Sequence, residues 1–195
     1  MNLVFATNNE HKLEEVRALL GDKIELKSLA DIGCYEDIPE TGITFEENAK
    51  QKTDYLIARY AVNCFGDDSG LEIDALNGEP GVYSARYSGS RDMEKNIALV
   101  LEKLNGTRTR TARFRTVISL VLDAKQYFFE GAIAGTILPS KRGFEGFGYD
   151  PIFVPDGYDR TFAQMSLDEK NQISHRALAV AKLTTFLNAR WRRDQ

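Results

Sequence analysis

The sequence predicts an α/β fold built on a mixed β-sheet with flanking helices. Three features carry this prediction: an apolar run followed by an amphipathic helix near the N-terminus, two long strand-like runs in the middle, and a periodic helix near the C-terminus. Because strands and helices do not alternate strictly, we expect parallel and antiparallel pairs in one sheet. The length of 195 residues, 43% of them hydrophobic, suits a single domain over residues 1–195.

The first elements are predicted to be a strand, a polar turn and a helix. The apolar run Leu3–Ala6 indicates a buried strand. Leucine and valine then recur at helical spacing over 13–20, and Gly21 stands where a helix C-cap belongs. Residues 24–29 could form a second strand, and 30–43 an irregular connection.

A second and a third helix are predicted on either side of a polar run. Thr44 and Glu47 form a capping box, so a helix should start there. The run 66–70 is polar, and 71–75 alternates like a short strand. The third helix is predicted to run from a cap at Ser90 to about residue 104.

The second half should contain a hairpin and two further helices. Residues 112–122 and 126–138 are rich in Val, Ile, Phe and Thr, with a three-residue turn between them. The stretch 143–151 is a glycine-rich loop. A capping box at Ser166–Glu169 and a cap at Ser174 predict the last two helices.

The composition argues against several classes of protein. Lys and Arg total 25 against 29 Asp and Glu, a net charge of −4, whereas a general nucleic-acid binder carries excess positive charge. No apolar run approaches the roughly 20 residues of a membrane span, and no signal peptide is recognisable. Cys34 and Cys64, thirty positions apart, suit reduced thiols. We therefore expect a cytoplasmic protein without nucleic-acid or membrane partners.

The first candidate site is Thr7-Asn8-Asn9-Glu10-His11-Lys12, which lies between the first strand and its helix. A helix start presents N–H groups and a positive dipole end, both favourable to phosphate, and Lys12 could reach the same anion. The segment lacks the glycines of a Walker A loop. An ordinary capped helix is the alternative interpretation.

The second candidate is the acidic set Glu40, Asp67 and Asp68. Adjacent aspartates after an apolar pair are costly to bury unless they are solvated, paired or bound to a cation. Mg²⁺ takes oxygen ligands, so one carboxylate could bind the metal while another orients a water. A phosphatase of the haloacid dehalogenase type would instead need D-x-D after its first strand. A surface turn is the alternative.

Two further candidates lie in the second half. In the glycine-rich loop, Phe147 and Tyr149 could face a purine ring, and Asp150 could accept from its N–H groups. His175 and Arg176, with Lys170 nearby, bring positive charge to a helix start and could donate to a base carbonyl. A hairpin loop with exposed aromatics and a structural histidine are the alternatives.

Together these segments resemble the inosine/xanthosine triphosphate pyrophosphatase family, also called the Ham1-like or RdgB-like family. The resemblance spans almost the whole chain. The motifs that carry it are Ala6-Thr7-Asn8-Asn9-Glu10-His11-Lys12, Glu40-Thr41-Gly42, Thr44-Phe45, Glu47-Asn48-Ala49, Lys52, Asp67-Asp68-Ser69-Gly70-Leu71, Pro80-Gly81-Val82-Tyr83-Ser84-Ala85-Arg86-Tyr87, Gly146-Phe147-Gly148-Tyr149-Asp150-Pro151 and Ile173-Ser174-His175-Arg176. Asn8 stands where the family motif T-G-N-x-x-K has glycine.

The resemblance implies hydrolysis of ITP, dITP and XTP to the monophosphate and pyrophosphate, with Mg²⁺ as cofactor. Such a reaction would remove these nucleotides from the nucleotide pool. It also implies a homodimer and an elongated mixed sheet with two lobes around a central cleft. It assigns triphosphate contacts to Thr7, Asn9, Lys12 and Lys52, the metal to Glu40 and Asp68, and catalysis to Asp68. The remaining substrate positions are Asn8, Glu10, His11, Ser69, Phe147, Gly148, Tyr149, Asp150, Lys170, His175 and Arg176.

Two other functions stay open at this point. A pyrophosphatase of the Maf type, which acts on pyrimidine or modified nucleotides, resembles this family in fold. A nucleotide-binding module without catalysis would use the same residues for binding only. Turnover of UTP, dTTP and ITP separates the first alternative, and an Asp68→Asn variant that binds ITP without hydrolysis separates the second.

Overall fold

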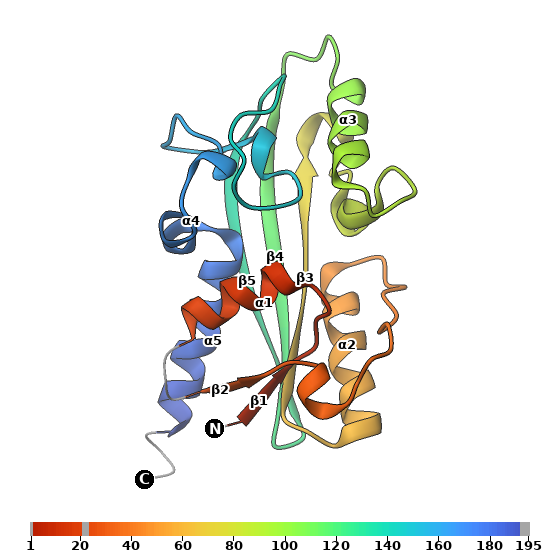
Figure 1. Ribbon diagram of the computed structural model, residues 1–195, viewed down its shortest axis with the longest axis vertical. Coiled ribbons are helices and arrows are strands. Elements are labelled where there is room, and N and C mark those ends of the chain that lie inside the picture. The colour runs from red at the N-terminus through yellow and green to blue at the C-terminus, as the bar shows by residue number, and fades with distance from the viewer. Residues whose placement is uncertain (1, 21–23, 192–195) are drawn as a thin grey trace. The chain divides into compact units, whose positions relative to one another are not determined.

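In the computed structural model, which describes residues 2–20 and 24–191, the strands form a mixed sheet in the order β2-β1-β3-β4-β5-β6 (Figure 1). β1 pairs in parallel with β2 and β3, and β5 pairs antiparallel with β6, which confirms the predicted mixed α/β class. The strands are β1 (Asn2–Phe5), β2 (Glu25–Lys27), β3 (Cys64–Ile73), β4 (Thr111–Leu122), β5 (Lys125–Ile137) and β6 (Phe153–Pro155).

Helices flank this sheet, and most of them begin where the sequence places a cap. They are α1 (Glu10–Leu19), α2 (Phe45–Tyr60), α3 (Met93–Lys103), α4 (Leu167–Ile173) and α5 (His175–Trp191), with short 3-10 turns at Ala30–Ile32, Asp74–Leu76, Gly81–Arg86, Asp150–Ile152 and Phe162–Gln164. The capping boxes at Thr44 and Ser166 are both present, which confirms these two starts.

The chain divides into two compact units, each with its own apolar core. The first comprises residues up to Asp68, Thr116–Gly131 and the chain from Arg176 onward, and the second comprises Ser69–Arg115 and Ala132–His175. The core of the second unit is a cluster of aliphatic and aromatic side chains from β3, α3, β4 and the segment 149–165.

Alternation along β1 explains how the first unit covers both faces of its sheet. Leu3 and Phe5 pack in a cluster with side chains of α1 and α5, whereas Val4 packs in a second cluster with Leu56 of α2. The rings of Phe5 and Phe65 stack 4.5 Å apart. Each such fully buried side chain contributes roughly 1.5–3 kcal/mol, so the two clusters hold helices against β1 and β3 from either side.

Two boundaries differ from the predicted ones, and a third cannot be compared. The polar run 66–70 lies inside β3 and is not a turn, because both faces of this strand carry partners for its carboxylates. α3 is capped by Asp92 instead of Ser90, since the Asp92 carboxylate accepts from two N–H groups of the first turn. Gly21 lies outside the described residues.

The predicted hairpin is confirmed with a tighter turn. β4 and β5 are joined by Asp123 and Ala124 alone, both in the left-handed region with φ of 50° and 60°. Two successive residues with positive φ match the twist of an antiparallel pair, so β4 and β5 form a hairpin. Cys34 and Cys64 are free and buried, as predicted for reduced thiols.

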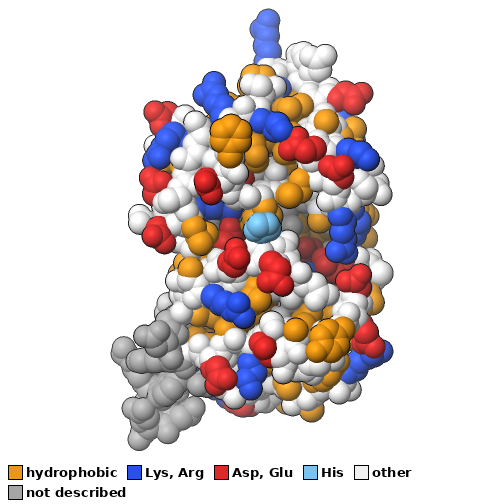
Figure 2. Space-filling view, viewed as in Figure 1, with side chains coloured by type: hydrophobic (Ala, Val, Ile, Leu, Met, Phe, Trp, Pro, Cys, Tyr) orange, Lys and Arg blue, Asp and Glu red, His pale blue; other side chains and the backbone are white. Residues whose placement is uncertain are grey.

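The surface carries charge of both signs. Figure 2 shows acidic and basic side chains interspersed with apolar ones on one face, in keeping with the small net charge of −4. Across residues 2–20 and 24–191, the structure contains no helix that is both long and apolar enough to cross a membrane.

Candidate functional site: a charged network around strand β3

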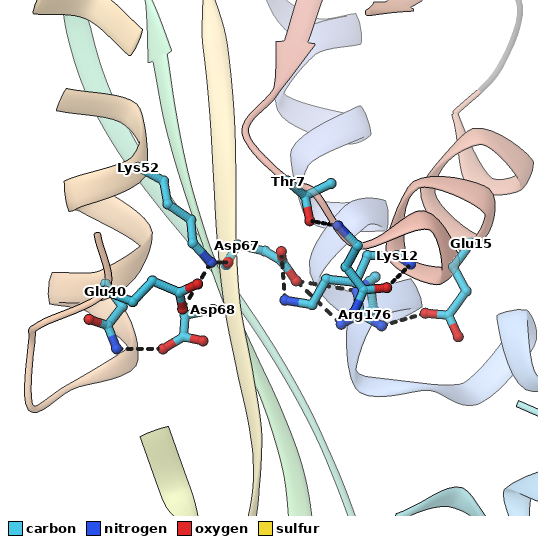
Figure 3. A network of polar contacts seen from close by, with 10 residues as sticks. Thr7, Lys12, Glu15, Glu40, Lys52, Asp67, Asp68 and Arg176 are labelled. Carbon is cyan, nitrogen blue, oxygen red and sulfur yellow. Dashed lines mark hydrogen bonds and ion pairs between the residues drawn. The ribbon is translucent and has the colours of Figure 1, made fainter. Parts of the chain in front are cut away.

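Two adjacent aspartates leave β3 on opposite sides (Figure 3). Successive side chains of a strand point to opposite faces, so Asp67 contacts α1 and α5 while Asp68 contacts α2. Both are buried, with 1% and 5% of their surface exposed. Gly66 lets α2 approach, because a Cβ there would lie 2.8 Å from the Lys52 Cβ and 3.1 Å from the Ala49 carbonyl oxygen.

Asp67 is surrounded by cations. Its Oδ1 lies 3.0 Å from the Lys12 Nζ, and its Oδ2 accepts from the Arg176 Nε and Nη2 at 3.3 Å each. Arg176 is 1% exposed and also donates from Nη1 to the buried carboxylate of Glu15. Two positive and two negative groups therefore balance one another in the interior, where an unpaired charge would be costly.

The pKa shifts in this network follow from burial and neighbouring charge. Burial alone would raise the pKa of Asp67, but Lys12, Arg176 and Lys52 outweigh it and hold that pKa well below its usual range. Burial also lowers the pKa of Lys12, and the Asp67 carboxylate only partly opposes this shift. Asp67 is therefore ionised at neutral pH and anchors the cations.

The pKa of Asp68 is shifted in the opposite direction from that of Asp67. Burial raises the pKa of its carboxyl above the ordinary value, the negative Glu40 adds to the shift, and Lys52 and Lys12 oppose it. The Asn48 Nδ2 donates to the Asp68 Oδ2 at 2.8 Å. A carboxylate whose pKa is raised toward neutrality is a better proton acceptor than an ordinary aspartate.

Lys52 links the strand at Asp67 to Glu40. Its buried ammonium donates to the backbone oxygen of Asp67 at 2.7 Å and lies 3.2 Å from a carboxylate oxygen of Glu40. Lys52 stands one helical turn after Asn48 on the same face of α2, so both side chains reach β3. Lys12 and Lys52 thus place two ammonium groups beside the same pair of strand residues.

The polar turn after β1 forms the start of α1. Asn9 is the N-cap, and its Oδ1 accepts from the Lys12 N–H at 3.1 Å, while Thr7 Oγ1 accepts from the Asn9 N–H. Asn8 turns its amide toward Asp37, at 3.4 Å. Glu10 and His11, two of the predicted substrate positions, have exposed side chains on the outer face of the helix start.

Glu40 and Asp68 provide oxygen donors suited to a hard cation. Their charges interact, and Figure 3 shows both on the α2 side of β3. Within the described residues no cluster of three or more His, Cys, Asp or Glu side chains is placed to hold a metal. Mg²⁺ commonly binds to about one or two carboxylates together with substrate phosphates and water, so Glu40 and Asp68 fit Mg²⁺. A closed zinc site would need about four protein ligands, which these residues do not provide.

The second unit brings together the other group of predicted residues. Asp150 and Lys170 form a buried ion pair at 2.7 Å, and the Asp150 Oδ2 also accepts from the Phe147 N–H at 2.9 Å. The Lys170 ammonium lies 4.9 Å from the centroid of the Phe147 ring. Gly146 is required here, because a Cβ at that position would lie 2.1 Å from the Asp150 Oδ2.

Tyr149 and His175 occupy more interior positions than the sequence suggested. Tyr149 packs in the core of the second unit, and its hydroxyl donates to the Ser84 backbone oxygen at 2.8 Å. The His175 ring stacks on Phe114 with centroids 4.7 Å apart. Gly148 donates its N–H to the Met93 Sδ at 3.1 Å.

The structure therefore gathers the predicted residues into two groups, one in each unit. Sequence reasoning missed Glu15 and Asn48 as members of the charged network. A signal existed for Asn48, which lies four residues before Lys52 on one helix face, but nothing in the sequence separates Glu15 from its exposed neighbour Glu14. The predicted Ser69 follows Asp68 directly in β3.

Sequence comparison supports one family over nearly the whole chain. A profile described as the Ham1 family matches residues 3–186. A dITP/XTP pyrophosphatase of Flavobacterium johnsoniae is 50% identical over 190 residues, which cover 97% of this chain and 99% of that protein. Another dITP/XTP pyrophosphatase, from Porphyromonas gingivalis, is 52% identical over 187 residues, or 95% of this chain and 96% of the relative.

Solved structures show the same fold. The Ham1 protein of Staphylococcus aureus superposes with a TM-score of 0.89 and 41% identity, covering 97% of this chain and all of that one. A nucleoside-triphosphatase/dITP/XTP pyrophosphatase from Mycobacterium abscessus gives a TM-score of 0.77 at 42% identity, covering 94% of this chain and 98% of its own.

Proposed function

The chain belongs to the Ham1 family, and we propose that it hydrolyses noncanonical purine nucleoside triphosphates (ITP, dITP and XTP) to the monophosphate and pyrophosphate. Such an enzyme would remove these nucleotides from the cytoplasmic pool. The observation that carries the proposal is the network around β3 in which Lys52, Asp67 and Asp68 are buried and Lys12 is partly buried. It combines cations for a polyphosphate with a carboxylate whose pKa is raised.

The triphosphate is assigned to the cations and the α1 start in the first unit. The ammonium groups of Lys12 and Lys52 are held in place by Asp67, so little side-chain freedom is lost when an anion binds. N–H groups at the start of α1 and the hydroxyl of Thr7 add donors at the same segment. These groups would stabilise the negative charge on the phosphate oxygens during hydrolysis.

Asp68 is the proposed general base. It would orient and deprotonate a water that attacks the α-phosphorus, and the bond from that phosphorus to the bridging oxygen would break, releasing pyrophosphate. Asp68 and Glu40 would hold Mg²⁺, which supplies charge neutralisation on the phosphate oxygens. Lys52 contacts Glu40 and would keep its carboxylate in place.

The purine is assigned to the second unit. Phe147 would contact the ring, and Asp150 and Lys170 would pair with its polar edge. His175 would donate to O6, which hypoxanthine and xanthine carry and adenine lacks. An unpaired buried polar group costs about 1–3 kcal/mol, so one mismatch with adenine corresponds to roughly ten- to a hundredfold discrimination.

A panel of nucleoside triphosphates tests the proposal. With Mg²⁺ present, we expect pyrophosphate from ITP, dITP and XTP, almost none from ATP, and no orthophosphate. Preference for UTP or dTTP would instead indicate a Maf-type enzyme. The Asp68→Asn variant should bind ITP in a calorimetric titration without turning it over, whereas a wild-type protein that binds ITP and never hydrolyses it would be a binding module.

A further inference from the structure

Asn48 is buried on α2 between Asp68 and the segment that carries Glu40 and Gly42. It is 0% exposed and lies on the face of the helix that meets β3. Its Nδ2 donates to the Asp68 Oδ2 at 2.8 Å, and its Oδ1 accepts from the Gly42 N–H, also at 2.8 Å. One side chain thus joins the strand that carries Asp68 to the segment that carries Glu40.

The chemistry of the partners fixes the orientation of this amide. Turned by 180°, the Asn48 oxygen would face the Asp68 carboxylate and its NH₂ would face the Gly42 N–H, so both contacts would become repulsive. An asparagine satisfies both partners, while an aspartate of the same shape can satisfy only Gly42. The donor to Asp68 is therefore the property that only the amide provides at this position.

Gly42 is adapted to the same contact. A Cβ at Gly42 would lie 2.9 Å from the Asn48 Oδ1 and 2.6 Å from the Glu47 Cβ, so any larger residue would push the segment away. The absence of a side chain lets the backbone approach closely enough for the 2.8 Å bond. Glu40 stands two residues before this anchor, so the position of its carboxylate depends on Asn48.

We propose that Asn48 is a positioning residue that holds Asp68 and the Glu40 segment at a fixed separation and thereby sets the affinity for the divalent cation and the rate of hydrolysis. This inference rests on the proposed function. Groups that orient metal ligands in this way typically change metal affinity or activity about 10–100-fold when they are replaced. Lys12 and Lys52 do not hydrogen-bond to Asn48 in this network, so binding of the triphosphate itself should change little.

Two substitutions separate positioning from packing. Asn48→Asp keeps the size of the side chain and the acceptor for Gly42 but replaces the donor to Asp68 with a like charge. Asn48→Ala removes both bonds. Thr53→Val is the matched control, because Thr53 is a fully buried polar residue of the same helix that bonds to Lys50 and Ser119 and not to the site.

The measurements are steady-state pyrophosphate release from ITP and binding of Mn²⁺ to the complex with α,β-methylene-ITP, followed by electron paramagnetic resonance. We expect both Asn48 variants to lose about 10–100-fold in kcat with KM for ITP within about threefold of wild type. Asn48→Ala should also bind Mn²⁺ about tenfold or more weakly. Thr53→Val should retain the wild-type kcat and Mn²⁺ affinity.

A double variant controls for folding. In Asn48→Asp with Asp68→Asn, the amide and the carboxylate exchange places, so the hydrogen bond and the total charge are kept. We expect its melting temperature to recover toward wild type while turnover stays absent. A wild-type kcat in Asn48→Asp would overturn the positioning role alone. A wild-type protein that releases no pyrophosphate from ITP would overturn the proposed function, and the inference with it.

Discussion

Replacing each of the two adjacent aspartates of β3 by asparagine should change stability in opposite directions. Asp67 is an ionised carboxylate held by the partly buried Lys12 and the buried Arg176, so Asp67→Asn leaves both cations with less compensating charge. Asp68 is a buried carboxylate whose pKa is raised, so its ionised form is disfavoured by the fold. Asp68→Asn removes that cost and can still accept the bond from Asn48 through its amide oxygen.

The expected magnitudes differ as well. Breaking a buried ion pair by removing one partner costs about 3–5 kcal/mol. For a chain of this size 1 kcal/mol corresponds to roughly 2–4 °C, so Asp67→Asn should lower the melting temperature by roughly 6–20 °C. Asp68→Asn should raise the free energy of unfolding by an amount on the order of 1 kcal/mol, as is common when a residue kept for activity is replaced.

The pH dependence gives a second check with a defined sign. The folded-state pKa of Asp67 is lowered, so its stabilising contribution is complete above the unfolded value, about 3.9, and is lost as the pH falls through the folded value. The folded-state pKa of Asp68 is raised, so its destabilising contribution is complete above the folded value and vanishes below about 3.9. The differences in unfolding free energy between wild type and the Asp67→Asn and Asp68→Asn variants should therefore be largest at neutral pH.

The assay is urea unfolding of the wild type and both variants at pH 7, 5 and 3.5, with circular dichroism as the signal. Asp67→Glu is a control variant, because it keeps the negative charge and lengthens the side chain by a methylene group. If Asp67→Asn were as stable as wild type at pH 7, the ion network would not stabilise the fold and the electrostatic reasoning about β3 would be wrong.

Three other predictions concern the same residues. Gly66→Ala should place a methyl group 2.8 Å from the Lys52 Cβ and lower the free energy of unfolding by about 1–3 kcal/mol in calorimetry, with a loss of activity toward ITP; an unchanged melting temperature would contradict the close packing. Lys52→Met should reduce kcat/KM for ITP by roughly 10- to 150-fold, because it removes a charge-assisted contact; wild-type kinetics would exclude a role in the reaction. Asp150→Asn should weaken the preference for ITP over ATP about tenfold or more, measured as the ratio of kcat/KM values, and an unchanged ratio would place base recognition elsewhere.

Much of the architecture could be predicted from local sequence patterns. The caps at Thr44 and Ser166 depend on hydrogen bonds within a few residues, and the hairpin joins two strands that are adjacent in the chain, so their signals are present in the sequence. The strand β3 could not be placed from pattern alone, since a run of Gly, Asp and Ser favours a turn. Contacts from helices far away in sequence overrode that local preference.

The site was predictable in its residue types but not in its pairings. Lys12 could be singled out because it stands at a predicted helix start, and Asp67 and Asp68 because they follow an apolar pair. That Arg176 would bond to Asp67 and Glu15 could not be inferred, because these bonds span 109 and 161 positions of the chain. Long-range charge pairing depends on which helix faces meet, and the sequence pattern does not determine this.

The two carboxylates of β3 differ in their chemistry because successive side chains of a strand point to opposite faces of the sheet. A one-residue insertion in β3 before Asp67 would move Asp67 into the position now held by Asp68, beside Asn48, and would carry Asp68 one position further along the strand. A one-residue deletion would instead move Asp68 into the position beside Lys12 and Arg176 and carry Asp67 away from both environments. Neither change keeps a carboxylate in both environments, so the length of β3 before this pair should not vary, even though both positions carry the same amino acid.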